Sequence, residues 1–175
     1  IRKVIKIMYE DIRNKKGFIS DMDGVLYHGN HLLDGVVDFV NWLQENGKEF
    51  IFLTNSSERT PQELSKKLSR MGLEVPEKHF YTSALATAEF LSKQMPGCSA
   101  YVIGEAGLAN ALYDCGIYMN DVNPEYVIVG DTRTYNFEKI EKAIALVNKG
   151  AKLIGTNPDI TGPTENGIMP AVGAL

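Results

Sequence analysis

Short apolar segments alternate with amphipathic segments along most of the chain, and this alternation restricts the available folds more than any other feature. The apolar segments, which we predict to be strands, cover residues 17–20, 49–55, 100–104, 126–130 and 151–157. The amphipathic segments, which we predict to be helices, cover residues 34–47, 60–72, 83–94, 105–116 and 136–150. Strands that alternate with helices in this way favour a parallel sheet with right-handed crossovers. The sequence therefore predicts an α/β fold.

The segment 76–84, PEKHFYTSA, is a candidate boundary between two parts of the chain. After it the sequence becomes richer in Ala and Gly, and the strand–helix rhythm starts again. We predict two modules, residues 1–82 and residues 83–175, with one continuous sheet as the alternative. A length of 175 residues fits one domain, or one core with part of a second. In the last segment, 164–175, we expect a loop and the start of a helix, so that the second module looks incomplete.

Composition and charge exclude several classes of protein. A net charge of −4 and a pI near 5.4 argue against general attraction to nucleic acid or to an anionic membrane. Residues 1–17 are locally basic with apolar residues at helical spacing, which predicts a short helix packed on the body; a membrane-surface or partner helix is the alternative. No apolar run is long enough to span a bilayer. Cys98 and Cys115 lack a CxxC spacing, so we expect reduced thiols and a cytoplasmic protein.

Two aspartates follow the first predicted strand, in the segment FISDMDGVLYHG at residues 18–29. A carboxylate held rigidly at a strand end can attack phosphorus, and Asp21 is placed for this. Asp23, two residues later, can protonate the leaving oxygen and then deprotonate water. Gly24 allows a sharp turn, so that backbone amides can approach phosphate oxygens. The alternative is an ordinary Asx-type turn that caps a helix, and the aspartate pair alone does not decide between the two.

Thr54 and Asn55 follow the second predicted strand, in the segment FIFLTNSS. Because parallel strands end at the same edge of a sheet, Thr54 and Asp21 are expected to lie close together. The Thr54 hydroxyl can donate a hydrogen bond to a phosphate oxygen, and Asn55 can add its backbone N–H. Together the two segments favour chemistry at a phosphate group over a structural turn.

At this point the sequence resembles the haloacid dehalogenase (HAD) superfamily of phosphatases. FISDMDGVLYHG is similar to the first motif of that superfamily, hhhDxDGxL, and FIFLTNSS to the second, hhhTN. IGTNPDITGPTENGIMPAVGAL resembles the TNPD and GxxPxxGxL segments of the NagD and p-nitrophenylphosphatase branch. The resemblance implies a Rossmann-like HAD core, partial in this chain and covering residues 1–82, with an inserted α/β cap in residues 83–175.

The resemblance also implies roles for individual residues. Asp21 would be the nucleophile and a Mg²⁺ ligand, and Asp23 the general acid and base, binding the metal through its backbone carbonyl. Gly24, Thr54 and Asn55 would hold the transferring phosphoryl group. Asn157 and Asp159 would lie in a cap loop that faces the substrate, although Asn-Pro-Asp is otherwise an ordinary turn.

The chain departs from the superfamily pattern at its third and fourth motifs, which supply a lysine and further acidic metal ligands and which we expect beyond Leu175. GDTRTYN resembles a fourth motif at Gly130 and Asp131, but its second acid is absent. We therefore interpret Asp131 as a cap residue; the alternative is a capless phosphatase in which Asp131 shares a metal with Asp21. The chain by itself is expected to have little activity.

The function that we predict is a Mg²⁺-dependent phosphomonoester hydrolase that forms an aspartyl-phosphate and acts on a sugar phosphate, a nucleotide or a similar small metabolite. The alternative is a non-catalytic HAD-like domain that binds a phosphorylated ligand or a partner. We expect no nucleic acid or membrane partner, and the resemblance allows a homodimer through the cap. His28 and His31 are interpreted as surface residues, and His79 as a loop residue with no visible partner.

Overall fold

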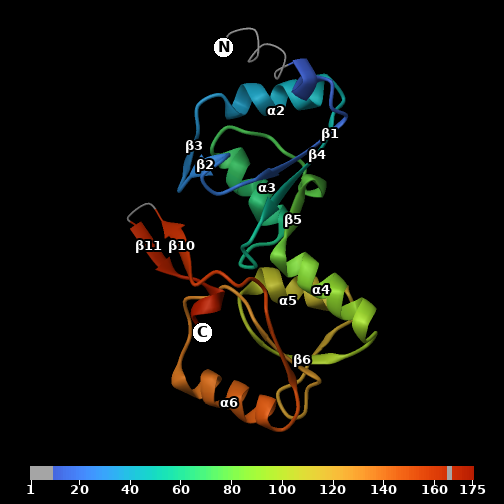
Figure 1. The fold of residues 1–175 in the computed structure, drawn as a ribbon, viewed down its shortest axis with the longest axis vertical. Coiled ribbons are helices and arrows are strands. Elements are labelled where there is room, and N and C mark those ends of the chain that lie inside the picture. Colours follow the sequence, from blue (N-terminus) through green and yellow to red (C-terminus); the bar gives the residue numbers. More distant parts are fainter. Residues whose placement is uncertain (1–9, 165–166) are drawn as a thin grey trace.

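The computed structural model describes residues 10–164 and 167–175, and its strands form two separate parallel sheets. In Figure 1 the sheet formed by the first half of the chain lies above the sheet formed by the second half, with a small red hairpin beside the junction. The α/β fold predicted from the alternation is therefore confirmed. The predicted helix at the start of the chain falls largely on residues 1–9, which lie outside the described residues.

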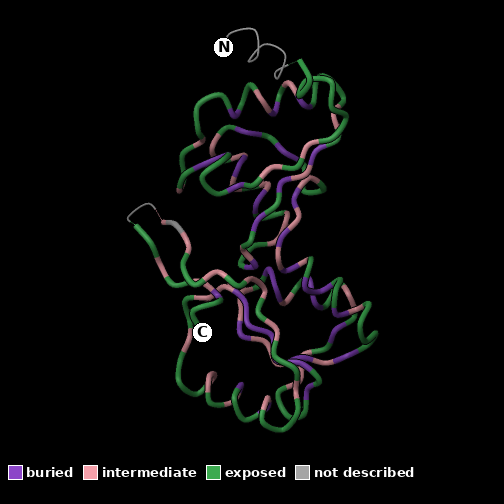
Figure 2. Tube along the Cα trace, in the orientation of Figure 1, coloured by how far each residue is buried: buried purple, intermediate pink, exposed green. Residues whose placement is uncertain are grey.

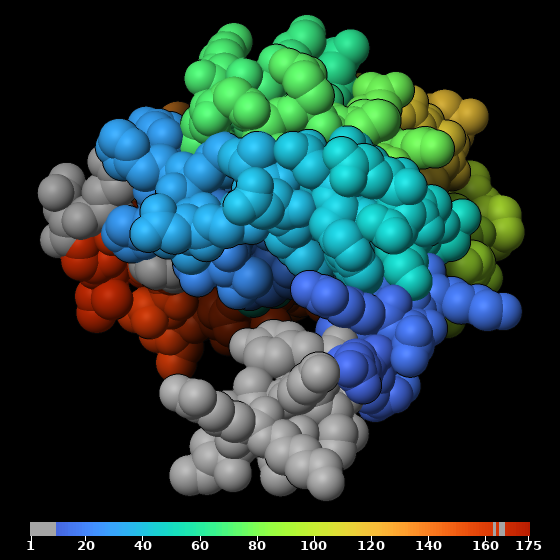
Figure 3. All heavy atoms as spheres, turned by 90° about the horizontal axis from the view of Figure 1, so that it is seen from above, coloured from blue at the N-terminus to red at the C-terminus, as the bar shows by residue number. Residues whose placement is uncertain are grey.

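The first sheet has the order β1-β4-β5, and all its strands are parallel. Its strands are β1 (Gly17–Asp21), β4 (Glu49–Thr54) and β5 (Phe80–Thr82). Two helices, α2 (Val36–Glu45) and α3 (Pro61–Arg70), pack against it. Seen from above in Figure 3, the atoms of α2 form the outer layer at this end of the molecule. A small antiparallel pair, β2 (Tyr27–His28) and β3 (His31–Leu32), follows the first strand.

Helix α3 begins where its sequence predicts. Thr60 accepts a hydrogen bond from the Glu63 N–H, and the Glu63 side chain accepts one from the Thr60 N–H, which is a complete capping box. Pro61 occupies the first turn, where its missing N–H leaves no intrahelical bond unmade. At the other end, Gly72 has a φ of 89°, a conformation that ends the helix without the strain that a side chain would bring.

The second sheet has the order β7-β6-β8-β9 and is also parallel. Its strands are β6 (Ser99–Ile103), β7 (Tyr118–Met119), β8 (Tyr126–Val129) and β9 (Lys152–Gly155). Helices α4 (Ser83–Gln94) and α5 (Ala106–Asp114) pack on one face, and α6 (Phe137–Asn148) packs on the other. The two faces are reached by alternate residues of β8, as Ile128 contacts the α4–α5 side and Val127 the α6 side. Figure 2 shows the resulting buried core in purple.

The end of the chain differs from the prediction of a loop and a nascent helix. It forms an antiparallel hairpin, β10 (Thr161–Thr164) and β11 (Gly167–Pro170), followed by a 3₁₀ turn, η2 (Val172–Ala174). The first part of this segment finds hydrogen-bonding partners in a strand that precedes it, which its own sequence does not reveal. A short 3₁₀ turn, η1 (Glu77–His79), and β5 occupy the segment interpreted as a boundary. The first sheet ends at Thr82 and α4 begins at Ser83, while the division into domains 1–82 and 83–175 stays a prediction.

Candidate active site

The aspartate pair lies in a tight turn at the carboxyl end of β1. Asp21 is the last residue of the strand, and its Oδ1 accepts a hydrogen bond of 2.7 Å from the Met22 N–H. The Met22 side chain is fully buried and anchors the turn in the core. Gly24 has a φ of 77° and donates its N–H to the Tyr27 carbonyl at 2.8 Å. A buried anchor and a glycine in the left-handed region thus hold two exposed carboxylates at the end of a strand.

The Tyr27 side chain contacts the second aspartate, Asp23. Its side chain is buried, and its hydroxyl donates a hydrogen bond to the Asp23 carboxylate. Burial first, and then the neighbouring Asp23 charge, raise the pKa of Tyr27 well above its ordinary value, so that the phenol stays protonated as a donor. The Lys67 ammonium lies 3.7 Å from the centre of the Tyr27 ring. Sequence reasoning missed this residue, although its place four residues after Asp23 in the predicted turn is a usable signal.

Thr54 lies beside the aspartate pair, because β4 is the direct neighbour of β1 and parallel to it. Asp21 is paired in register with Leu53, the residue before Thr54. The Thr54 side chain is buried, and its Oγ1 accepts a hydrogen bond of 3.1 Å from the Ser56 N–H. With that lone pair used, the hydroxyl proton remains for another acceptor. The predicted proximity of Thr54 and Asp21 agrees with this pairing.

Asn55 is hydrogen-bonded to residues of the second half of the chain. Its carbonyl accepts hydrogen bonds from the Ser83 hydroxyl at 2.6 Å and from the Asn157 side-chain amide at 3.0 Å. Its own side-chain amide donates to Asp159 Oδ2 at 2.6 Å. The Asp159 N–H in turn donates to Asn157 Oδ1 at 3.0 Å. Asn157 and Asp159, which the sequence assigns to a substrate-facing loop, therefore contact the loop that follows β4.

The Asn-Pro-Asp loop is itself fixed by the end of the chain. The Gly173 N–H donates to the Asp159 carbonyl at 2.8 Å. A Cβ atom on Gly173 would overlap the Pro158 carbonyl, so only glycine permits this approach. The glycine near the end of GxxPxxGxL therefore has a steric reason that follows from the fold.

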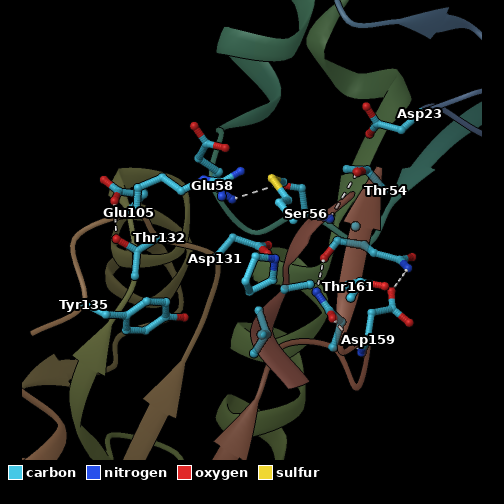
Figure 4. A pocket seen from close by; sticks show the side chains of 18 of the residues that line it. Asp23, Thr54, Ser56, Glu58, Glu105, Asp131, Thr132, Tyr135, Asp159 and Thr161 are labelled. Carbon is cyan, nitrogen blue, oxygen red and sulfur yellow. Dashed lines mark hydrogen bonds between the residues drawn. The ribbon is translucent and has the colours of Figure 1, made fainter. Parts of the chain in front are cut away.

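A cavity of about 310 Å³ lies between the two sheets and is lined by residues from both. Of the sequence-predicted residues, Asp21, Asp23, Thr54, Asn55, Asn157 and Asp159 line it. Gly24 does not, since it lies in the turn between Asp23 and Tyr27. The close-up in Figure 4 shows Asp23 and Thr54 on one side of the cavity and Glu105, Thr132 and Tyr135 on the other.

The lining of this cavity is strongly acidic. Its carboxylates are those of Asp21, Asp23, Glu58, Glu105, Asp131 and Asp159. Among the described residues that line it, Arg133 is the one cationic side chain. Oxygen ligands of this kind suit a hard cation, and a phosphate could approach only if part of the negative charge were neutralised. Within residues 10–164 and 167–175, however, no group of three or more acidic, His or Cys side chains is close enough to form a complete metal site.

Several lining residues were not identified from the sequence. Glu105 follows the end of β6 and precedes α5, and Thr132 follows the end of β8. The Thr132 hydroxyl donates a hydrogen bond to Glu105, which joins these two connections (Figure 4). The rule that ligands collect at the carboxyl ends of parallel strands, which located Asp21 and Thr54, would have found them as well.

Asp131 lies two residues after the end of β8, in the part of the chain that the resemblance assigns to the cap. Its carboxylate accepts hydrogen bonds from the Ser57 N–H and hydroxyl, at 2.8 and 3.1 Å. These contacts tie it to the loop that follows Thr54 and Asn55.

The histidines lie away from the cavity. His28 and His31 are exposed and paired across the β2–β3 hairpin, in agreement with a surface position. The expectation that His79 has no partner is wrong. Its Nδ1 lies 2.8 Å from the Phe50 carbonyl, and its ring stacks on the Phe50 ring at 3.9 Å. This contact forms between residues that are distant in the sequence.

Among the described residues, no helix has the length and apolar character needed to cross a membrane.

Comparison with known proteins gives a consistent result. A family model described as haloacid dehalogenase-like hydrolase matches residues 18–118. Dihydroxyacetone phosphatase of Corynebacterium glutamicum is 47% identical over 158 residues, covering 90% of this chain and 58% of the relative. Ribonucleotide monophosphatase NagD of Escherichia coli is 44% identical over 160 residues, covering 91% and 62%. The structure of a 4-nitrophenylphosphatase from Thermotoga maritima superposes with a TM-score of 0.88 at 34% identity, covering 93% of this chain and 62% of that one. The chain thus spans about three fifths of the length of these proteins.

Proposed function

Since this chain belongs to the haloacid dehalogenase-like hydrolase family, in its NagD-like branch, we propose that the gene product containing it hydrolyses phosphomonoesters. The observation that carries the proposal is that residues far apart in the sequence, Asp21, Thr54 and Asp159, line one small cavity between the two sheets. The printed names of the relatives, which are phosphatases, support the same class of reaction.

In the proposed reaction Asp21 is the nucleophile. One carboxylate oxygen attacks phosphorus, and the bond from phosphorus to the ester oxygen breaks, leaving an aspartyl-phosphate. The carboxyl group of Asp23 gives its proton to the departing oxygen and then takes one from the water that attacks the aspartyl-phosphate. Inorganic phosphate leaves, and the Asp21 carboxylate is restored. The Tyr27 hydroxyl supports this scheme, because its hydrogen bond holds the Asp23 carboxyl in one orientation.

Thr54, Asn55 and Gly24 hold the phosphoryl group in this proposal. The Thr54 hydroxyl donates to a phosphoryl oxygen, and the N–H of Asn55 adds a second donor. The conformation of Gly24 supports the close approach of the turn backbone to the same group. Asn157 and Asp159 position the Asn55 end of the loop and form part of the wall on the substrate side.

Mg²⁺ is the proposed cofactor, since the oxygen-rich lining suits a hard cation. The Asp21 carboxylate and the Asp23 backbone carbonyl would hold it. When bound, the ion supplies positive charge that offsets repulsion between the carboxylates and the phosphate.

The proposed substrates are small phosphorylated metabolites, such as a sugar phosphate or a nucleotide. The cavity of about 310 Å³ is at the lower end of the range for ligand pockets, about 300–1,000 Å³, which favours a small leaving group. A cytoplasmic location, no nucleic acid or membrane partner, and a homodimer through the cap, residues 83–175, complete the proposal. The net charge of −4 supports the absence of general nucleic acid binding.

The test is Asp21→Asn in the complete gene product, with p-nitrophenyl phosphate as substrate and Mg²⁺ present. We expect kcat to fall by at least about 1,000-fold, because the amide is a poor nucleophile. Asp38→Asn is the matched control, as Asp38 is an exposed aspartate on α2 outside the cavity. Undiminished turnover by the Asp21 variant would contradict the proposal. A wild-type protein that binds phosphate without hydrolysing the ester would favour the non-catalytic alternative.

A further inference from the structure

Several hydrogen bonds hold the loop after Thr54 and Asn55 to the second half of the chain, and three of them join Ser57 to Asp131, with a fourth from Thr156 Oγ1 to Ser57 Oγ at 3.3 Å. Asp131 Oδ2 accepts hydrogen bonds from the Ser57 N–H at 2.8 Å and from the Ser57 hydroxyl at 3.1 Å. In return, the Asp131 N–H donates to Ser57 Oγ at 2.8 Å. Ser57 is fully buried, so these bonds are shielded from competition with water. Hydrogen bonds to a charged acceptor are among the stronger kind.

The backbone packs as closely as the side chains do at this contact. Gly130 precedes Asp131, and a Cβ atom there would lie 2.7 Å from Ser57 Oγ. Gly107, at the start of α5, donates its N–H to the Glu58 carbonyl at 3.0 Å. A Cβ atom on Gly107 would lie 2.6 Å from the backbone of Arg59. Two glycines, one in α5 and one just after β8, therefore let the loop at residues 57–59 lie directly against the second half of the chain.

This contact reaches the phosphate-binding residues through a short path. Ser57 is three residues after Thr54, and the intervening Ser56 N–H donates to Thr54 Oγ1. The Asn55 carbonyl is held at the other end by Ser83 and Asn157. The loop is thus fixed at both ends by groups from the second half of the chain. Asp131 also lines the cavity, but its Oδ2 is engaged with Ser57.

We propose that Ser57 and Asp131 form a positioning pair, through which the second sheet sets the place of the Thr54 hydroxyl and the Asn55 N–H at the phosphoryl group. This inference rests on the proposed phosphatase function. Asp131 contributes no proton and no contact with the leaving group; it acts through Ser57. A displacement of about 1 Å in a residue that orients a reacting group costs on the order of 100-fold in rate. Asp131, 74 residues after Ser57 in the sequence, thus restrains the position of the phosphate-binding loop.

The experiment compares Asp131→Ala, Ser57→Ala and the double variant in the complete gene product. It measures kcat and KM for p-nitrophenyl phosphate and for glycerol phosphate, and the inhibition constant of inorganic phosphate. For the single variants we expect kcat/KM to fall by about 10- to 100-fold, with a similar factor for the two esters. The inhibition constant of inorganic phosphate should rise. The loss in the double variant should be smaller than the product of the two single losses, because each single variant already removes the bond from the Ser57 hydroxyl to the Asp131 carboxylate. Asp131→Asn keeps one acceptor oxygen for the Ser57 N–H and should be intermediate.

Asp121→Asn is the matched control. Asp121 is an exposed aspartate in the same half of the chain, paired with Lys142 and absent from the cavity lining. Its substitution should leave kcat, KM and the inhibition constant unchanged.

Three results would overturn the proposal. A loss that differs between the two esters with an unchanged phosphate inhibition constant would mean that Asp131 contacts the leaving group. A lower melting temperature with unchanged kinetic constants would mean a structural role only. Multiplicative losses in the double variant would mean that the two residues act separately.

A measurement without substrate separates this proposal from the proposed function. Hydrogen exchange of the Ser57 amide should be faster in Asp131→Ala than in the wild type, whether or not the protein is a phosphatase. An unchanged exchange rate would contradict the pairing itself. Normal pairing in a protein without phosphatase activity would contradict only the proposed function, and with it the catalytic consequence.

Discussion

The two sheets have the same parallel construction but differ in how many faces they bury. In the second sheet all four residues of β8 are buried, because α4 and α5 cover one face and α6 the other. In the first sheet α2 and α3 cover one face, where Phe50 and Phe52 lie. On the opposite face Ile19 is 74% exposed and Leu53 is 38% exposed. The residues of β1 accordingly alternate between exposed and half-buried, whereas the residues of β8 are buried without interruption.

The candidate reactive groups lie on the first sheet, whereas the second sheet has the more complete hydrophobic core. The aspartate pair and Thr54 come from the sheet with one covered face. The loop that carries Thr54 and Asn55 is fixed by bonds from the other sheet. The position of the candidate catalytic groups therefore depends on packing that takes place elsewhere in the chain.

The largest expected effect is the difference between two isoleucine-to-alanine substitutions, one in each sheet. Ile128→Ala removes a side chain with 0% exposure from β8 and should lower the free energy of unfolding by about 3 kcal/mol, through lost burial and a cavity. Ile19→Ala removes an exposed side chain from β1 and should change it by less than about 0.5 kcal/mol. Urea unfolding of both variants measures the difference. Equal losses would mean that the open face of the first sheet is covered in the complete protein, and the contrast would not hold.

The second prediction concerns the place where the two parts meet. Gly107→Ala inserts a Cβ atom within 2.6–2.7 Å of the backbone of Glu58 and Arg59, and should cost about 1–2 kcal/mol of unfolding free energy. Because the displaced loop carries the phosphate-binding residues, kcat/KM should fall about 10-fold or more. Thermal unfolding and p-nitrophenyl phosphate kinetics measure the two effects.

Gly17→Ala is the control for that substitution. A Cβ atom on Gly17 would have its nearest neighbour, the Glu49 carbonyl oxygen, at 3.7 Å, which is an ordinary contact. Both stability and kinetics should be close to the wild type. A Gly107 variant that behaved like the Gly17 variant would show that the loop and α5 can separate without consequence.

The smallest expected effect is a titration at the start of the second sheet. The Glu125 carboxylate accepts hydrogen bonds from the Ser99 hydroxyl and N–H, both at 2.7 Å. These bonds, the hydroxyl first, hold the pKa of Glu125 below its ordinary value of about 4.5. A depressed pKa means that the contribution to stability is present above the ordinary value and is lost as pH falls through the lowered one.

Because Glu125 is exposed, solvent screens this contribution and the effect on stability should be small. NMR titration should place the pKa of Glu125 below 4.5 in the wild type and closer to it in Ser99→Ala. An identical pKa of Glu125 in both proteins would mean that the Ser99 hydroxyl does not stabilise the Glu125 carboxylate.

The sequence predicted a helix or strand well where its periodic pattern and its capping residues lie within that helix or strand. Helix α4 has the predicted bounds, Ser83–Gln94, and α3 begins at the predicted cap. The proximity of Asp21 and Thr54 followed from strand order alone. Strand β5 was missed because three residues are too few for a periodic pattern. The hairpin at the end of the chain was missed because both of its strands, TGPT and GIMP, contain Gly and Pro, which are depleted in strands.

The contacts between the two halves were not predictable from the sequence. The bond from Asn55 to Asp159 joins residues 104 positions apart, and the bonds from Ser57 to Asp131 span 74. Serine, asparagine and aspartate at these positions are also ordinary turn residues, so their types alone do not indicate a partner. The positions of Glu105 and Asp131 after strands fit the strand-end rule, but that rule does not show that they share one cavity with Asp21 and Thr54.

The hydrogen bond from Ser83 to the Asn55 carbonyl has a mechanical consequence. The chain passes from β5 into α4 between Thr82 and Ser83, beside this bond. Helix α6 lies at the far end of the molecule in Figure 1. If the second sheet tilts about this connection, the displacement of each residue grows with its distance from the connection. Such a tilt would swing α6 widely, and it would also strain the hydrogen bonds from Ser57 to Asp131 and from Asn55 to Asp159. Access to the cavity and the alignment of the groups that hold the phosphate are therefore coupled.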